Sequence, residues 1–142
     1  MNRISPILAI ALLAWSSSAL AQRDIHLTSM SLDGVTVVDY AVPIERAAAS
    51  PRWDSGKGDP PLSQVRAIQI ANAELKRRLP ATQGLQLQSI ILNRVSDGPY
   101  GNLWYYSLDY RPLAGSPPKP AWITHIIVLL DGSIVDAIIH AP

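Results

Sequence analysis

Hydrophobic residues recur with the period of an α-helix over residues 63–79. The apolar positions follow one another at spacings of three and four, and they are Val65, Ile68, Ala71, Leu75 and Leu79. Polar residues fill the positions between them, so one face of the helix is expected to be buried. Ser63 is a suitable N-cap, and Pro80 cannot continue a helix. The pattern therefore predicts one amphipathic helix.

Residues 85–140 change to patterns typical of β-strands. Four strands are expected, at residues 85–95, 103–111, 122–130 and 134–139. The second strand alternates most clearly between its two faces. The alternation of the first strand slips near Ser89, which indicates a bulge. The third strand is apolar on both sides, which is typical of a strand covered on both faces, and Asp131-Gly132 predicts a tight turn before the fourth.

The preceding segment, residues 22–61, has two parts. Strand-forming residues surround Asp33-Gly34 in residues 22–42, so this part is expected to form a short hairpin or a strand that docks on the main sheet. Prolines and glycines interrupt residues 43–61, which indicates a connector with one helical turn at residues 44–49. Trp53 is expected to pin this connector to the domain by burying its ring.

A single helix followed by four antiparallel strands predicts an α+β domain. The helix would pack its apolar stripe across one face of a curved four-stranded sheet. The expected organisation is a signal peptide at residues 1–21, an extended segment and connector at residues 22–61, and the helix-plus-sheet domain at residues 62–142.

The first 21 residues have the three regions of a cleavable signal peptide. Arg3 gives a positive start, an apolar run follows, and Ala19-Leu20-Ala21 is a small-x-small cleavage site before Gln22. The apolar run is shorter than the roughly 20 residues of a membrane-spanning helix. We therefore expect a periplasmic or secreted protein with no membrane span after cleavage.

The composition of the chain argues against one class of partner and against cysteine chemistry. Arg3 is the one basic residue within the expected signal peptide, so the remaining chain has equal numbers of acidic and basic residues. This balance argues against nucleic acid as a partner. The chain has no cysteine, so neither disulfides nor thiol chemistry contribute.

Residues 62–139 resemble the PepSY family of small extracytoplasmic domains. The resemblance rests on Leu62-Ser63, on the alanines of the helix, on the run Trp104–Leu108 and on the closing run Ile127–Val135. Asp131-Gly132-Ser133 stands where the family usually has a Thr-Gly pair, and residues 22–61 have no counterpart. The resemblance implies a cystatin-like layout and a non-catalytic role in modulating proteases or other envelope proteins. The family shares no active site, so it implies no catalytic residues for this chain.

Motifs for catalysis and for metal binding are missing from the sequence. His26, His125 and His140 do not form a metal-ligand pair at short spacing, and no nucleophile elbow or phosphate-binding glycine loop occurs. We therefore predict no catalytic residues, no metal and no cofactor. Of the three histidines, His125 lies in the most apolar strand and is the one candidate for an acid–base role.

A binding surface is predicted on the second strand. Trp104, Tyr106 and Tyr110 are expected to pack under the helix, which leaves Tyr105, Asp109 and Arg111 on the opposite face, with His125 nearby. If nothing covers that face, Tyr105 would be exposed between charges and suited to binding. The alternative is that residues 22–42 fold over it.

Two functions follow from these observations. The first is an exported, non-enzymatic binding or modulating module that acts on another envelope protein, either periplasmic or membrane-anchored. The second is a small periplasmic enzyme or ligand-binding domain with a pocket between helix and sheet that includes His125. A homo-oligomer joined through sheet edges is a third possibility, and the sequence does not determine the oligomeric state.

Overall fold

The computed structural model describes residues 24–79, 84–95 and 98–140. The expected signal peptide, its cleavage site and Pro80 lie outside these residues. The described chain is an α+β fold with two antiparallel sheets. The helices are α1 (Ile44–Ala49), α2 (Gln64–Arg78) and α3 (Ala121–Thr124), with a short 3-10 turn η1 (Gly98–Tyr100). None of the described helices is long and apolar enough to cross a membrane.

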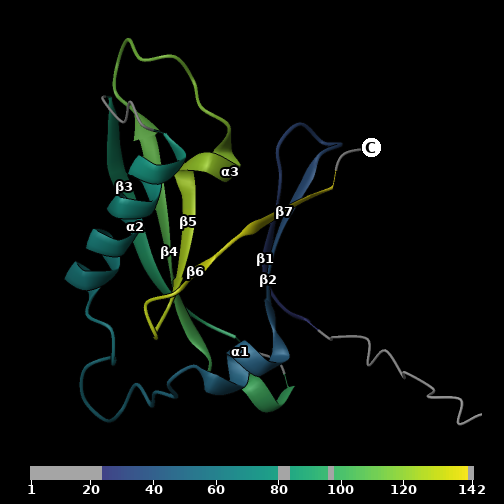
Figure 1. Ribbon diagram of the computed structural model, residues 1–142, viewed down its shortest axis with the longest axis vertical. Helices are drawn as coiled ribbons and strands as arrows, with labels where there is room; N and C mark the ends of the chain where they lie inside the picture. Colours follow the sequence, from purple (N-terminus) through teal and green to yellow (C-terminus); the bar gives the residue numbers. More distant parts are fainter. Residues whose placement is uncertain (1–23, 80–83, 96–97, 141–142) are drawn as a thin grey trace, which may run out of the picture.

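The strands form a three-stranded sheet and a four-stranded sheet. Sheet A has the order β1 (Asp24–Ser31), β2 (Val37–Pro43) and β7 (Ala137–His140). Sheet B has the order β3 (Leu85–Arg94), β4 (Trp104–Pro112), β5 (His125–Leu129) and β6 (Ile134–Val135). Figure 1 shows α2 on one side of sheet B and sheet A on the other, so sheet B is the middle layer.

Helix α2 begins and packs largely as the sequence predicts. The Ser63 hydroxyl caps the helix by accepting a hydrogen bond from the backbone N–H of Arg66 at 3.2 Å. Ala67, Ala71 and Leu75 are buried against sheet B. The expectation for Val65 is wrong, because its side chain is 66% exposed. The buried stripe is rotated toward the two alanines, since small side chains let the helix approach the sheet closely.

Strand β4 confirms the predicted alternation. Tyr106, Leu108 and Tyr110 belong to the core cluster under α2, whereas Tyr105 belongs to the cluster between the two sheets. The predicted bulge is also present, because the register of β3 against β4 shifts between Leu87 and Ser89.

Two predictions for the C-terminal strands need correction. Residues 121–124 are helical, so the third strand of sheet B begins only at His125. The backbone N–H of Ile123 donates to the carbonyl of Pro120, and the fixed φ of that proline suits the start of a helix. The predicted fourth strand is divided at Asp136: β6 pairs with β5, and β7 crosses to pair with β2 in sheet A (Figure 1).

The N-terminal segment forms a hairpin and covers the second face of sheet B. Strands β1 and β2 pair around the Asp33-Gly34 turn, as expected for the hairpin alternative. Val38, Tyr40 and Val42 on β2 are fully buried in the cluster between the sheets. The connector then crosses to the helix side, where the Trp53 ring packs edge-on against Trp104 with centroids 4.9 Å apart. Trp53 is therefore an anchor of the connector, as predicted.

Candidate functional site

The four residues predicted to form a binding surface lie at one face of sheet B but differ in exposure. His125 lies directly opposite Asp109 in the register of β5 and β4. Tyr105 is only 6% exposed, and its hydroxyl donates to the carbonyl of Leu27 in β1 at 3.2 Å. Arg111 is exposed near the end of β4. Sheet A therefore covers Tyr105, so the open-face alternative does not hold at that residue.

His125 is held between the two sheets by two side-chain contacts, to Asp109 and to Tyr40. Its Nδ1 lies 2.6 Å from Oδ1 of Asp109, and the Ser89 hydroxyl donates to the other oxygen of that carboxylate at 3.1 Å. An ionised carboxylate only accepts hydrogen bonds, so Nδ1 carries the proton in this pair. The His125 ring also packs against the Tyr40 ring with centroids 5.2 Å apart. These contacts fix both the tautomer and the orientation of the imidazole.

The second ring nitrogen of His125 is buried. His125 is 9% exposed, and its Nε2 has no hydrogen bond to any of the described residues. Nearby, burial raises the pKa of the Tyr40 hydroxyl to about 12, and that hydroxyl donates to the His125 carbonyl at 3.4 Å. A general base must reach the proton that it removes. Because Nε2 is enclosed, the geometry of His125 fits an orienting contact between the sheets.

A second histidine cluster lies on the outer face of sheet A. Nε2 of His140 in β7 is 2.9 Å from the Asp39 carboxylate in β2, and Nε2 of His26 in β1 is 3.6 Å from it. A hydrogen bond from the Ser29 hydroxyl, followed by the nearby His140 and His26, holds the pKa of Asp39 below its usual range. In the described ranges no group of three His, Cys, Asp or Glu side chains is placed to hold a metal ion.

This cluster was missed by sequence reasoning because its members are distant along the chain. The three strands that carry it come together only through the crossing of β7 to sheet A, which the pattern of residues 134–139 does not reveal. The short distances tie the three strands of sheet A to one another on the solvent side.

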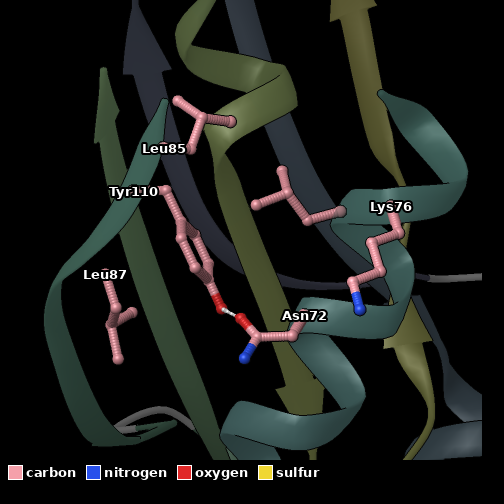
Figure 2. Close-up of a pocket in the computed structure, with 6 residues that line it drawn as sticks. Asn72, Lys76, Leu85, Leu87 and Tyr110 are labelled. Atoms are coloured by element: carbon pink, nitrogen blue, oxygen red, sulfur yellow. Dashed lines mark hydrogen bonds between the residues drawn. The ribbon is translucent and has the colours of Figure 1, made fainter. Parts of the chain in front are cut away.

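Two cavities lie between α2 and β3. One, of about 280 Å³, is lined by Asn72, Leu75, Lys76, Leu85, Leu87 and Tyr110 (Figure 2). The other, of about 390 Å³, is lined by Asp59, Pro60, Ser63, Gln64, Ile90, Leu92 and Tyr106. We call them the Lys76 cavity and the Asp59 cavity, and we refer to the two cavities together as the α2–β3 groove.

The groove exists because α2 is not centred on sheet B. Helix α2 packs over β4 and β5, which leaves the apolar side chains of β3 beside the helix and not beneath it. The bulge between Leu87 and Ser89 places four apolar side chains on the helix side of β3, although their spacing is not regular. These residues are Leu85, Leu87, Ile90 and Leu92. They form an apolar floor along the length of the strand.

Polar groups line the helix side of the Lys76 cavity. Figure 2 shows the Tyr110 hydroxyl directed at Asn72, to whose Oδ1 it donates at 2.7 Å. Burial raises the pKa of this hydroxyl to about 12, so it stays protonated as a donor at neutral pH. The Asn72 amide nitrogen and the Lys76 ammonium lie on the same side of the cavity and have no partner within the described chain.

A third cavity, of about 220 Å³, lies where the end of α2 meets β7. Arg77, Arg78, Asp136, Ala137 and Ile139 line it. The guanidinium groups of Arg77 and Arg78 bind the Glu74 carboxylate at 2.6 and 2.7 Å, and these hydrogen bonds lower the pKa of Glu74.

Comparison of the chain with protein-family models, with curated proteins and with solved structures finds no match.

His125 and the α2–β3 groove lie on opposite faces of sheet B. Ile126 and Val128 of β5 point to the helix side, whereas His125 and Ile127 point toward sheet A. The two cavities of the groove lie between helix and sheet, but His125 lines neither of them. None of the four residues predicted for a binding surface lines the groove.

Proposed function

We propose that this chain is an exported, non-enzymatic binding module that acts on another envelope protein by taking up an extended segment along β3. One observation carries the proposal: the α2–β3 groove runs along a free sheet edge. Among the described residues, strand β3 pairs only with β4, so within this part of the chain the N–H and C=O groups of its other side have no strand partner. Adding a strand at such an edge is a common mode of peptide recognition.

Apart from the bulge between Leu87 and Ser89, strand β3 has little of the usual protection of an edge strand. Exposed edges are commonly blocked by proline, lysine or other charges. Strand β3 has ten residues, and Arg94 at its end is the only charged one. Ile91 is 52% exposed on the face opposite the groove. A long uncharged edge with apolar side chains on both faces favours pairing with another strand.

The resemblance of residues 62–139 to the PepSY family supports the same function. That family implies a cystatin-like layout of one helix on an antiparallel sheet and a modulating role toward proteases or other envelope proteins. The enclosed Nε2 of His125 favours binding over catalysis. A partner that is periplasmic or membrane-anchored fits the expected export of the chain.

Peptide selection followed by amide exchange tests the proposal. Peptides are selected from a random displayed library against the folded protein, and amide hydrogen exchange is measured with and without the strongest binder. We expect slower exchange within Leu85–Arg94 and unchanged exchange in β1, which is the matching edge of sheet A. Protection in β1 in place of β3, or failure to select any binder, would contradict the proposal.

A further inference from the structure

The two cavities of the groove lie at opposite ends of β3 and carry opposite charges. Lys76 lines the cavity beside Leu85 and Leu87, whereas Asp59 lines the cavity beside Ile90 and Leu92. Neither charged group has an ion-pair partner in the described residues. The lining of the groove therefore presents a cation at the beginning of β3 and an anion near its end, where the guanidinium of Arg94 lies over Trp104 and is bound to Gly101 and Asn102.

The groups around the Lys76 cavity suit a carboxylate attached to an apolar side chain. Leu75, Leu85 and Leu87 provide apolar walls, and the Lys76 ammonium and the Asn72 amide nitrogen are donors at the rim (Figure 2). Donors of this kind make the stronger, charge-assisted hydrogen bonds to an ionised carboxylate. The Asp59 cavity would repel the same group.

We infer that the α2–β3 groove binds the C-terminal segment of a partner protein, with the terminal carboxylate at Lys76 and Asn72 and the last apolar side chain in the Lys76 cavity. This inference rests on the proposed function and names the segment that the edge takes up. The charges also fix its direction. The segment runs from the Asp59 cavity to the Lys76 cavity, so it pairs antiparallel to β3, like every other strand pair in the described sheets.

The register of β3 sets the spacing of the side chains that enter the two cavities. Leu87 lies opposite Tyr110 and Ile90 lies opposite Leu108, because the bulge removes one residue from the ladder. The centres of the two cavities are therefore separated by about four ladder positions, and side chains an even number of residues apart share a face. The partner segment is expected to carry apolar residues at its C-terminus and about four positions before it.

Fluorescence anisotropy with a defined probe tests this inference. The probe is a fluorescein-labelled peptide that ends in Leu-Thr-Thr-Thr-Leu with a free carboxylate, because threonine favours extended structure. The first comparison is the same peptide with a C-terminal amide, which we expect to bind about tenfold more weakly. A third peptide with its leucines three positions apart should also bind more weakly, since only one side chain can enter the groove.

A double-mutant cycle assigns the carboxylate to Lys76. In the Lys76→Gln variant, we expect the acid peptide to bind about three- to tenfold more weakly and the amidated peptide to bind as it does to the unchanged protein. Lys57→Gln is the matched control, because Lys57 is an exposed lysine that lines neither cavity and pairs with Asp54. In this control the difference between acid and amide peptides should persist.

Three outcomes would overturn the inference. If acid and amide peptides bind equally and Lys76→Gln affects neither, while β3 amides still gain protection, the carboxylate assignment is wrong and the proposed function stands. If 4-methylpentanoate displaces the probe as effectively as the unlabelled acid peptide does, the cavity binds small free carboxylates. If the protein instead dimerises through β3 in sedimentation experiments and the probe does not bind, a second copy occupies the edge, and the proposed function fails too.

Discussion

Asp109 is the residue through which the buried histidine is held. The register of β4 and β5 places it directly opposite His125, and the bulge in β3 brings the Ser89 hydroxyl to its second oxygen. Part of the carboxylate remains exposed, so it keeps some hydration while it accepts a hydrogen bond from a buried ring. Because the Asp109 carboxylate is only partly desolvated, the free-energy cost of burying it is small. The contact still holds the imidazole of His125 in one orientation.

Removal of this acceptor should measurably destabilise the fold. We expect Asp109→Ala to lower the free energy of unfolding by about 1–3 kcal/mol, because the buried N–H of His125 loses its partner. Asp109→Asn keeps a carbonyl acceptor and should cost less. The control is Asp54→Ala, which removes an exposed pair with Lys57 and should cost less than about 1 kcal/mol. Urea unfolding measures all three, and equal losses for Asp109→Ala and Asp54→Ala would show that the contact contributes nothing specific.

At the scale of single elements, the sequence predicted the features that depend on interactions between neighbouring residues. The Ser63 cap, the alternation of β4 and the bulge in β3 were all predicted, since each depends on neighbouring residues. The division of residues 134–140 between two sheets was not predicted. Ile138 and Ile139 have the pattern of any strand, and their pairing depends on the β1–β2 hairpin, about one hundred residues earlier in the chain.

The α2–β3 groove could not be predicted from the sequence by the same reasoning. Its floor residues Leu85 and Leu87 were expected to lie on a strand, which is correct, and the structure places them on the helix side. Whether they are covered depends on the lateral position of α2 over the sheet, and that position follows from packing of Ala67 and Ala71 against β4 and β5. The spacing of apolar residues along α2 shows which face of the helix is buried. It does not show which strand of sheet B the helix leaves uncovered.

The rotated packing of α2 can be tested with two apolar residues on the same helix. We expect Leu75→Ala to cost about 2–5 kcal/mol, because Leu75 is buried in the cluster under the helix and its truncation leaves a cavity. Val65→Ala removes apolar atoms that are mostly in water, so it should cost less than about 0.5 kcal/mol. Denaturant unfolding of the two variants provides the measurement. Equal costs would mean that α2 is seated with Val65 toward the sheet.

Sheet B connects the whole molecule, because both core clusters include its strands. Tyr105, Ile127 and Leu129 contribute to the cluster with sheet A, and their neighbours Tyr106, Ile126 and Val128 contribute to the cluster with α2. The crossing from β6 to β7 adds a covalent link between the sheets (Figure 1). If sheet A or helix α2 detached from sheet B, one face of the strands of sheet B would be exposed to water. We therefore expect sheet A and α2 to unfold together.

A substitution in sheet A should therefore weaken the protection of α2 on the far side of sheet B. Val38 is fully buried on β2, and we expect Val38→Ala to cost about 1–3 kcal/mol. If unfolding is cooperative, the slowest-exchanging amides of α2, near Ala71 and Leu75, should exchange about tenfold faster for each 1.4 kcal/mol lost. Val65→Ala should leave these rates nearly unchanged. Faster exchange confined to β1 and β2, with α2 still at its original rates, would show instead that sheet A opens as a separate unit. In that case sheet B and α2 would form the more stable part of the fold, and the α2–β3 groove would persist without the hairpin.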